Sequence, residues 1–218
     1  MTHIADSPIP APTAESWSFA EAHSPLADGL QQARSEAIQA GLTPVSSGVA
    51  STLTVLAKAV NARTVVEIGT ALGTSALPLL AGMTSDGVLT SIDSEADNQL
   101  PARVFLNAAG YPPSRCRLIA GTPLEILPKL RDGAYDIVFI NGDKLEYVEY
   151  VAAALRLLRS GGLLILHDVL WYNTVANPGR EGDETIIIRE ALDAVQAAES
   201  YTTTLLTVGN GLLVAVKN

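Results

Sequence analysis

The sequence has one cysteine, no long apolar run and no cluster of basic residues, and each of these absences excludes a class of protein. Cys116 has no second cysteine with which to form an internal disulfide, so the cytoplasm is the expected compartment. No apolar stretch approaches the roughly 20 residues that span a bilayer. The N-terminus also lacks the basic start and apolar core of a signal peptide. We therefore expect a cytoplasmic protein with no membrane partner.

The charge balance excludes a second class. The 14 basic and 23 acidic residues give a formal net charge of −9 at pH 7, and a protein of this sign is not expected to bind the phosphate backbone of a nucleic acid. Apolar residues, by contrast, make up 48 % of the 218 residues. That content and length suffice for one large α/β domain with its own core.

The pattern of residues divides the chain into three parts. Residues 1–14 hold three prolines and no apolar periodicity, which predicts a disordered tail. Residues 15–60 are expected to form a helical extension that packs on the rest of the protein. Within it, residues 26–40 have helical spacing, and Thr43-Pro44 has the form of an N-cap and first-turn proline for a helix that runs to about Val60. Residues 61–218 are expected to be the ligand-binding domain.

In that domain, strand and helix patterns alternate, which favours a parallel sheet with helices on both faces. The predicted strands are residues 64–68, 88–92, 117–120, 135–140 and 163–167. The predicted helices are residues 74–81, 95–109, 124–130, 146–158 and 183–198. Two further strands, 202–208 and 212–217, flank the turn Gly209-Asn210-Gly211, and this hairpin pattern predicts an antiparallel last strand. We expect an α/β fold with seven strands in a mostly parallel sheet.

The segment TVVEIGTALGTS (residues 64–75) is the strongest indication of a ligand. Glu67 interrupts an apolar strand that leads directly into Gly69 and Gly73. A carboxylate at the end of a buried strand is costly unless a polar group binds it, and ligands of open α/β sheets sit at these strand ends. The next strand ends in Asp93, which can accept both hydroxyls of a ribose. The alternative is a plain glycine turn with solvated carboxylates.

The spacing of the glycines bears on which nucleotide binds. A dinucleotide-binding G-x-G-x-x-G motif that starts at Gly69 would need glycines at positions 71 and 74, which are Ala71 and Thr74. A nicotinamide-dependent oxidoreductase is therefore disfavoured. The pattern E-x-G-x-x-x-G-x-S instead resembles motif I of S-adenosylmethionine (SAM) enzymes, whose ligand carries a cation and no pyrophosphate.

Two further segments, YDIVFINGDKLEYVEY (residues 135–150) and GGLLILHDVLWYNTV (residues 161–175), resemble signatures of the catechol and caffeoyl-CoA O-methyltransferase-like family. The resemblance covers about residues 26–217. It implies the Rossmann-like fold of class I methyltransferases, SAM as cofactor, a homodimer, and methyl transfer to a small phenolic or catechol-like hydroxyl. The residues that it implies for SAM binding are Val45, Glu67, Gly69, Thr70, Gly73, Ser75, Asp93, Gly121, Thr122 and Asp143.

The metal site of that family is altered in this chain. Members usually hold Mg²⁺ with an Asp at the end of the fourth strand and an Asp-Asn pair after the fifth. The corresponding residues here are Asn141, Asp168 and Val169. Because a hard cation prefers several oxygens, preferably anionic, we expect no tightly bound Mg²⁺ and predict no metal ligands.

The resemblance places Lys144, Asp168 and His167 at the methyl acceptor. Lys144 is expected to act as a general base or to stabilise a phenolate; the alternative is an exposed residue at a helix start. Asp168 is either a hydrogen-bond acceptor for the substrate or a helix N-cap. His167 either replaces the metal as a base or is structural.

Asn141, Trp171 and Tyr172 are expected to contact the acceptor, and Tyr147 is a further candidate, although aromatic residues after strands often only pack. Because the metal site is altered, a catalytically silent SAM-binding protein, acting as a regulator or partner subunit, remains an alternative to the enzyme.

Overall fold

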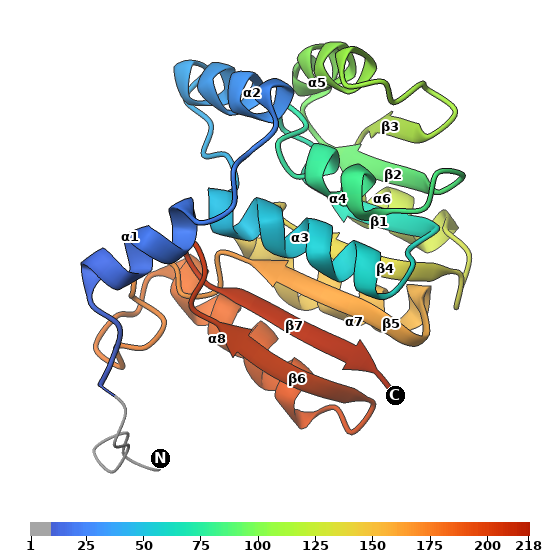
Figure 1. Cartoon of the computed structure of the whole chain (residues 1–218). Helices are drawn as coiled ribbons and strands as arrows, with labels where there is room; N and C mark the ends of the chain where they lie inside the picture. The colour runs from blue at the N-terminus through green and yellow to red at the C-terminus, as the bar shows by residue number, and fades with distance from the viewer. Residues whose placement is uncertain (1–9) are drawn as a thin grey trace.

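Seven strands form a single sheet in the computed structural model, which describes residues 10–218 (Figure 1). The strands are β1 (Thr64–Ile68), β2 (Val88–Asp93), β3 (Cys116–Ala120), β4 (Tyr135–Ile140), β5 (Leu158–His167), β6 (Tyr201–Leu206) and β7 (Leu212–Lys217). Their order across the sheet is β3-β2-β1-β4-β5-β7-β6. Strands β1 to β5 pair in parallel, whereas β7 runs antiparallel to both β5 and β6. The mostly parallel sheet with an antiparallel last strand is thus confirmed.

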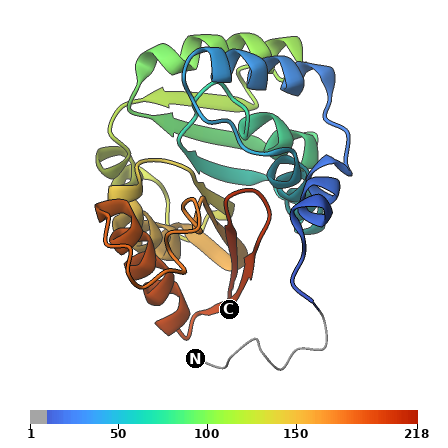
Figure 2. The ribbon, with the colours of Figure 1, turned by 90° about the vertical axis from the view of Figure 1, so that its left-hand side faces the viewer.

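Helices cover both faces of this sheet (Figure 2). They are α1 (Ala14–Ala22), α2 (Asp28–Gln39), α3 (Ser47–Ala59), α4 (Ala76–Gly82), α5 (Ala96–Ala108), α6 (Pro123–Ile126), α7 (Tyr147–Leu157) and α8 (Asp183–Ala197), with the short 3₁₀ turns η2 (Leu127–Lys129) and η3 (Lys144–Glu146). One apolar core lies between the sheet and α2 to α5, and a second lies between the sheet and α7 and α8.

The central strands are apolar on both faces because both faces are covered. In β1, Val65 packs into the core beneath α2 to α5, and its neighbour Val66 packs into the core beneath α7 and α8. This is the alternation of side chains along a strand. Parallel strands buried on both faces therefore read as continuous apolar runs, and the polar Glu67 stands out at the end of β1 for that reason.

Some boundaries differ from the prediction. The N-cap of α3 is Ser46, whose hydroxyl accepts from the backbone N–H of Val49 at 3.2 Å, so Thr43-Pro44 precedes the helix without starting it. β5 begins at Leu158, which pairs with Tyr135 of β4, and not at residue 163 as predicted. Helix α1 begins at Ala14, where Thr13 caps it. Residues 1–9 of the predicted tail lie outside the described residues.

Within residues 10–218, no helix is both long enough and apolar enough to cross a membrane.

Candidate functional site

A cavity of about 250 Å³ opens at the carboxyl ends of the central strands. The strand order reverses between β1 and β4, and the cavity lies at this switch point, where ligands of open α/β sheets bind. Of the residues expected to bind ligands, Gly69, Asp93, Thr122, Asn141 and Asp143 line it. No motif pointed to the remaining lining residues, which are Ala71, Ile92, Ser94, Pro123, Gly142, Glu146 and Tyr150.

Asp93 is held in the cavity wall by backbone donors. One of its carboxylate oxygens accepts from the N–H of Ala71 at 2.8 Å, and the other accepts from the N–H of Glu95 at 2.8 Å. These two bonds fix the plane of the carboxylate and leave lone pairs on both oxygens. The group is therefore oriented in advance for a ligand with two adjacent hydroxyls, such as a ribose.

Gly69 allows the turn after β1 to reach the end of β4. Its backbone φ is +94°, and a Cβ atom at this position would lie 2.4 Å from the carbonyl oxygen of Asn141. Only glycine combines this conformation with this close approach. The two halves of the cavity wall meet at this point.

Glu67 lies beneath the cavity and does not line it. The carboxylate is fully buried and accepts hydrogen bonds from the hydroxyls of Ser75, at 2.6 Å, and of Ser91. The hydroxyls of Ser91 and Thr70 are 2.6 Å apart. Burial raises the pKa of Glu67 to about 7. The motif led us to expect direct contact of Glu67, Thr70 and Ser75 with SAM, which stays a prediction; in the structure their hydrogen bonds, with that of Ser91, join these side chains below the Gly69–Gly73 turn.

Three other residues expected to bind SAM also lie outside the cavity lining. Val45 is fully buried in the apolar core beneath α2 to α5, and the lining includes neither Gly73 nor Gly121. The two glycines have φ of +80° and +147°, and the contact of all three residues with SAM stays a prediction.

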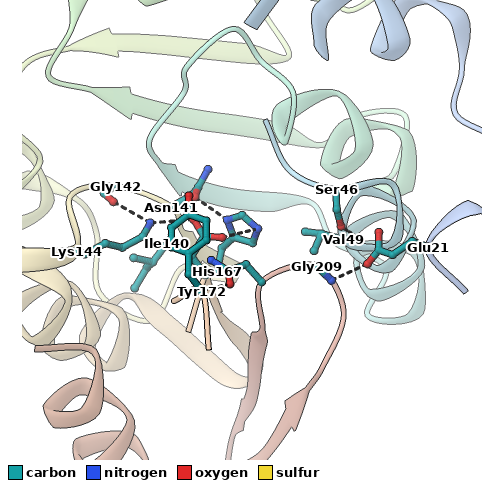
Figure 3. Close-up of polar contacts among 12 residues, drawn as sticks. Glu21, Ser46, Val49, Ile140, Asn141, Gly142, Lys144, His167, Tyr172 and Gly209 are labelled. Atoms are coloured by element: carbon teal, nitrogen blue, oxygen red, sulfur yellow. Dashed lines mark hydrogen bonds and ion pairs between the residues drawn. The ribbon is translucent and has the colours of Figure 1, made fainter. Parts of the chain in front are cut away.

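Beside the cavity, four side chains from two strand ends form a continuous polar chain (Figure 3). Asn141 Oδ1 lies 2.7 Å from His167 Nδ1, and His167 Nε2 lies 3.4 Å from one oxygen of Asp168. The other oxygen of Asp168 lies 3.4 Å from Lys144 Nζ, which donates to the carbonyl of Gly142 at 3.3 Å. Asn141, His167, Asp168 and Lys144 were all expected near the acceptor, and the fold brings them together.

Lys144 is enclosed by aromatic rings. Its Nζ atom lies 4.9 Å from the ring centre of Tyr147 and 5.7 Å from that of Trp171. The residue is only 9 % exposed, which excludes the alternative of an exposed helix start. Burial lowers the pKa of Lys144, and the Asp168 carboxylate opposes this shift. The pKa therefore moves toward the range in which an amine can accept a proton.

The His167 imidazole is neutral at pH 7, because burial lowers its pKa to about 4. A neutral ring has a single N–H, and Asp168 can only accept. Both contacts of the ring are satisfied when the Nε2–H points to Asp168 and Nδ1 accepts from the side-chain NH₂ group of Asn141. This requires the oxygen and nitrogen of the Asn141 amide to exchange places, a flip that leaves the rest of the side chain unchanged. His167 therefore fixes the orientation of its two neighbours.

The aromatic candidates differ in their positions. Trp171 packs beside Lys144, and Tyr172 is 65 % exposed with its ring 5.2 Å from that of Trp171. Tyr147 is fully buried and donates its hydroxyl to the carbonyl of His167 at 2.9 Å, so it supports the site from the core. Asp168 is followed by turns and no helix, which removes the N-cap alternative.

The positions at which the family resemblance implies metal ligands do not fit a divalent ion. Val169 is fully buried in the apolar core and offers no side-chain oxygen. The Asn141 amide contacts the His167 ring, and the single carboxylate, that of Asp168, already has Lys144 Nζ at 3.4 Å as its partner. Among residues 10–218, no group of three or more His, Cys, Asp or Glu side chains is arranged to hold an ion.

Known proteins resemble this chain over nearly its full length. The O-methyltransferase family model matches residues 19–218. A Mycobacterium tuberculosis protein named as a probable O-methyltransferase is 39 % identical over 211 residues, which cover 97 % of this chain and 94 % of that protein. The O-methyltransferase TomG of Streptomyces achromogenes, solved with SAM, has a TM-score of 0.85 and 26 % identity over 95 % of this chain and 100 % of its own. A Bacillus cereus O-methyltransferase solved with SAH (S-adenosylhomocysteine) has a TM-score of 0.84 and 25 % identity over 94 % and 99 %.

Proposed function

Because the chain belongs to the O-methyltransferase family, we propose that it transfers the methyl group of SAM to the hydroxyl of a small phenolic or catechol-like acceptor, without a tightly bound metal ion. SAM is the cofactor, as it is for relatives of the same fold that were solved with SAM or SAH. Asp93 and the other lining residues of the cavity would hold it.

The observation that carries this proposal is the position of Asn141. Asn141 lines the cavity, here called the donor cavity because SAM would bind in it. It also contacts His167, the next member of the polar chain that ends at Lys144. The cofactor and the acceptor groups thus share one wall. In-line transfer requires the sulfonium methyl group and the acceptor oxygen to be held close and collinear, and this shared wall supports such an arrangement.

In the proposed reaction, the acceptor oxygen forms a bond to the methyl carbon as the carbon–sulfur bond of SAM breaks, which leaves SAH. The neutral amine of Lys144 takes the proton from the hydroxyl and becomes an ammonium. Burial supports this role because it lowers the pKa of Lys144. Asp168 then stabilises the ammonium from 3.4 Å, and Trp171 and Tyr172 form the wall that the acceptor contacts.

The test is turnover of a panel of monophenols and catechols with SAM, with and without EDTA, followed by the formation of SAH. We expect turnover that EDTA does not change. Loss of activity in EDTA that added Mg²⁺ restores would contradict the metal-independent reaction. SAM binding with no transfer to any member of the panel would instead favour the catalytically silent alternative. The homodimer implied by the resemblance stays a prediction, which light scattering can test.

A further inference from the structure

The backbone that follows β5 is unusually strained. Four residues without glycine's freedom have φ in the left-handed region: Asp168 at 59°, Trp171 at 41°, Tyr172 at 53° and Asn173 at 64°. L-amino acids with bulky side chains rarely adopt this conformation. Such conformations persist only where the surrounding structure holds them, and they concentrate at functional sites.

This strain shapes the acceptor end of the site. Successive side chains of a strand point to opposite faces, yet His167 and Asp168 meet at 3.4 Å. The left-handed turn at Asp168 ends the alternation and brings its carboxylate to the imidazole and to Lys144. Three residues later, a second left-handed residue, Trp171, places its ring beside Lys144. The acceptor groups are therefore positioned by a backbone that would relax if nothing held it.

The turn between β6 and β7 holds this backbone. The side-chain oxygen of Asn210 accepts from the N–H of Tyr172 at 2.7 Å, and its backbone carbonyl accepts from the N–H of Leu170 at 2.9 Å. The carbonyl of Gly211 accepts from the N–H of Val169 at 3.2 Å. The approach is so close that a Cβ on Gly211 would lie 2.6 Å from the nitrogen of Leu170.

The same turn is fixed from its other side by α1. The Glu21 carboxylate accepts from the N–H of Gly209 at 2.6 Å and from the N–H of Gly48, in the first turn of α3, at 2.8 Å. Figure 3 shows Glu21, Gly209 and Ser46 on one side and His167, Tyr172 and Lys144 on the other. Segments from both ends of the chain thus converge on the Gly209-Asn210-Gly211 turn.

We propose that Asn210 is a positioning residue of the acceptor site, which acts through its hydrogen bond to the N–H of Tyr172 and keeps residues 168–173 in the left-handed conformation that assembles Asp168, Trp171 and Lys144. This proposal rests on the proposed function for its effect on catalysis. The donor cavity includes no residue of 168–173 or 209–211 among its lining residues. Loss of the Asn210 side chain should therefore affect the acceptor end and spare SAM.

Asn210→Ala is compared with Asn210→Asp, because a carboxylate oxygen can accept the same hydrogen bond. Asn177→Ala is the matched control, since its side chain also accepts from a backbone N–H, that of Gly179, in the same loop region. Hydrogen–deuterium exchange is measured for the amides of residues 169–173. Acrylamide quenching of Trp171 is measured in a Trp17→Phe background, in which Trp171 is the only tryptophan. Calorimetry gives the SAM affinity, and SAH formation with catechol gives kcat and KM.

For Asn210→Ala we expect about fivefold faster exchange, as loss of one hydrogen bond of ordinary strength implies, with stronger quenching of Trp171 and an unchanged SAM affinity. kcat with catechol should fall more than KM rises. Asn210→Asp should restore all of these values, and Asn177→Ala should leave them unchanged. Unchanged exchange and quenching in Asn210→Ala would overturn the proposal, as would a parallel loss of SAM affinity. Exchange and quenching decide it even if catechol is not turned over, an outcome that would count against the proposed function alone.

Discussion

Lys144 is the single residue on which the proposed chemistry depends most directly. It is nearly buried between two aromatic rings, and within residues 10–218 its one ion pair is with Asp168, at 3.4 Å. Lys144→Ala should lower kcat by about 10²- to 10⁴-fold, the range for loss of a general base, with little change in SAM affinity. Lys144→Arg should not restore activity, because arginine stays protonated. Restored activity in the arginine variant would show that the charge alone is needed. The exposed Lys58 provides a control in Lys58→Ala.

Two other buried groups give stability opposite dependences on pH. Glu67 has a pKa of about 7 in the folded chain, against 4.5 normally, so its contribution to the free energy of unfolding falls as pH rises from 4.5 to 7. His167 has a folded pKa of about 4, against 6.5 normally, so its contribution falls as pH drops from 6.5 to 4. Both signs follow from which state binds more protons. Over pH 4.5 to 6.5 the two effects oppose one another.

Replacing either group should therefore reveal the pH dependence that the other group contributes to stability. From pH 4.5 to 6.5, the free energy of unfolding of Glu67→Gln should rise relative to the unaltered protein by up to roughly 3 kcal/mol, and that of His167→Gln should fall by a similar amount. Urea denaturation at a series of pH values measures this. The remaining carboxylates are common to all three proteins, so parallel curves would contradict the assignment of these shifts.

At the scale of elements, the site depends on the approach of the turn after β1 to the end of β4. Gly69→Ala would place a methyl group 2.4 Å from the carbonyl oxygen of Asn141 at a φ of +94°. Gly110 is a matched control, because its φ is +85° and nothing lies within 4 Å of its Cβ position. Gly110→Ala should cost about 1 kcal/mol from backbone strain alone.

Gly69→Ala should cost several kcal/mol in the free energy of unfolding, since the turn or β4 must move, and it should weaken SAM binding. Thermal or urea unfolding and calorimetry with SAM measure the two effects. Equal losses of stability in Gly69→Ala and Gly110→Ala would show that the close approach of Gly69 to Asn141 does not contribute to stability.

The sequence predicted the strands and helices better than it predicted individual contacts. The parallel strands are buried on both faces, so their apolar runs were visible, and the turn Gly209-Asn210-Gly211 correctly predicted the hairpin. The errors lie where local signals compete. Thr43-Pro44 has the form of a helix start, yet the hydroxyl of Ser46 caps α3. The fifth strand was predicted to begin at residue 163, yet pairing of Leu158 with Tyr135 of β4 extends β5 back to Leu158.

At the scale of the whole molecule, SAM binding and folding are linked, because the cavity walls come from β1, β2 and β4 and exist only in the folded chain. SAM at 100 times its Kd should raise the free energy of unfolding by about 2.7 kcal/mol. Asp93→Ala should lose most of this gain. Asp97→Ala removes an exposed carboxylate four positions away and should keep it. Thermal shift with and without SAM measures the gain, and an equal gain in both variants would contradict the role of Asp93.

The sequence by itself determined the fold class, the strand ends at which the cavity opens, and the identity of Asp93, Lys144, His167 and Asp168 as candidates. The fold class, the strand ends and Asp93 follow from short-range patterns, namely periodicity, turn residues and motif spacing, whereas Lys144, His167 and Asp168 became candidates through the family resemblance. Only the tertiary structure decided what the side chains do. Glu67 contacts Ser91 because β1 and β2 pair in that register, and Asn141 contacts His167 because β4 lies beside β5. Asn210 reaches Tyr172 from a distant hairpin. No local pattern encodes such contacts, because they arise from strand order and register, which the packing of the complete chain sets.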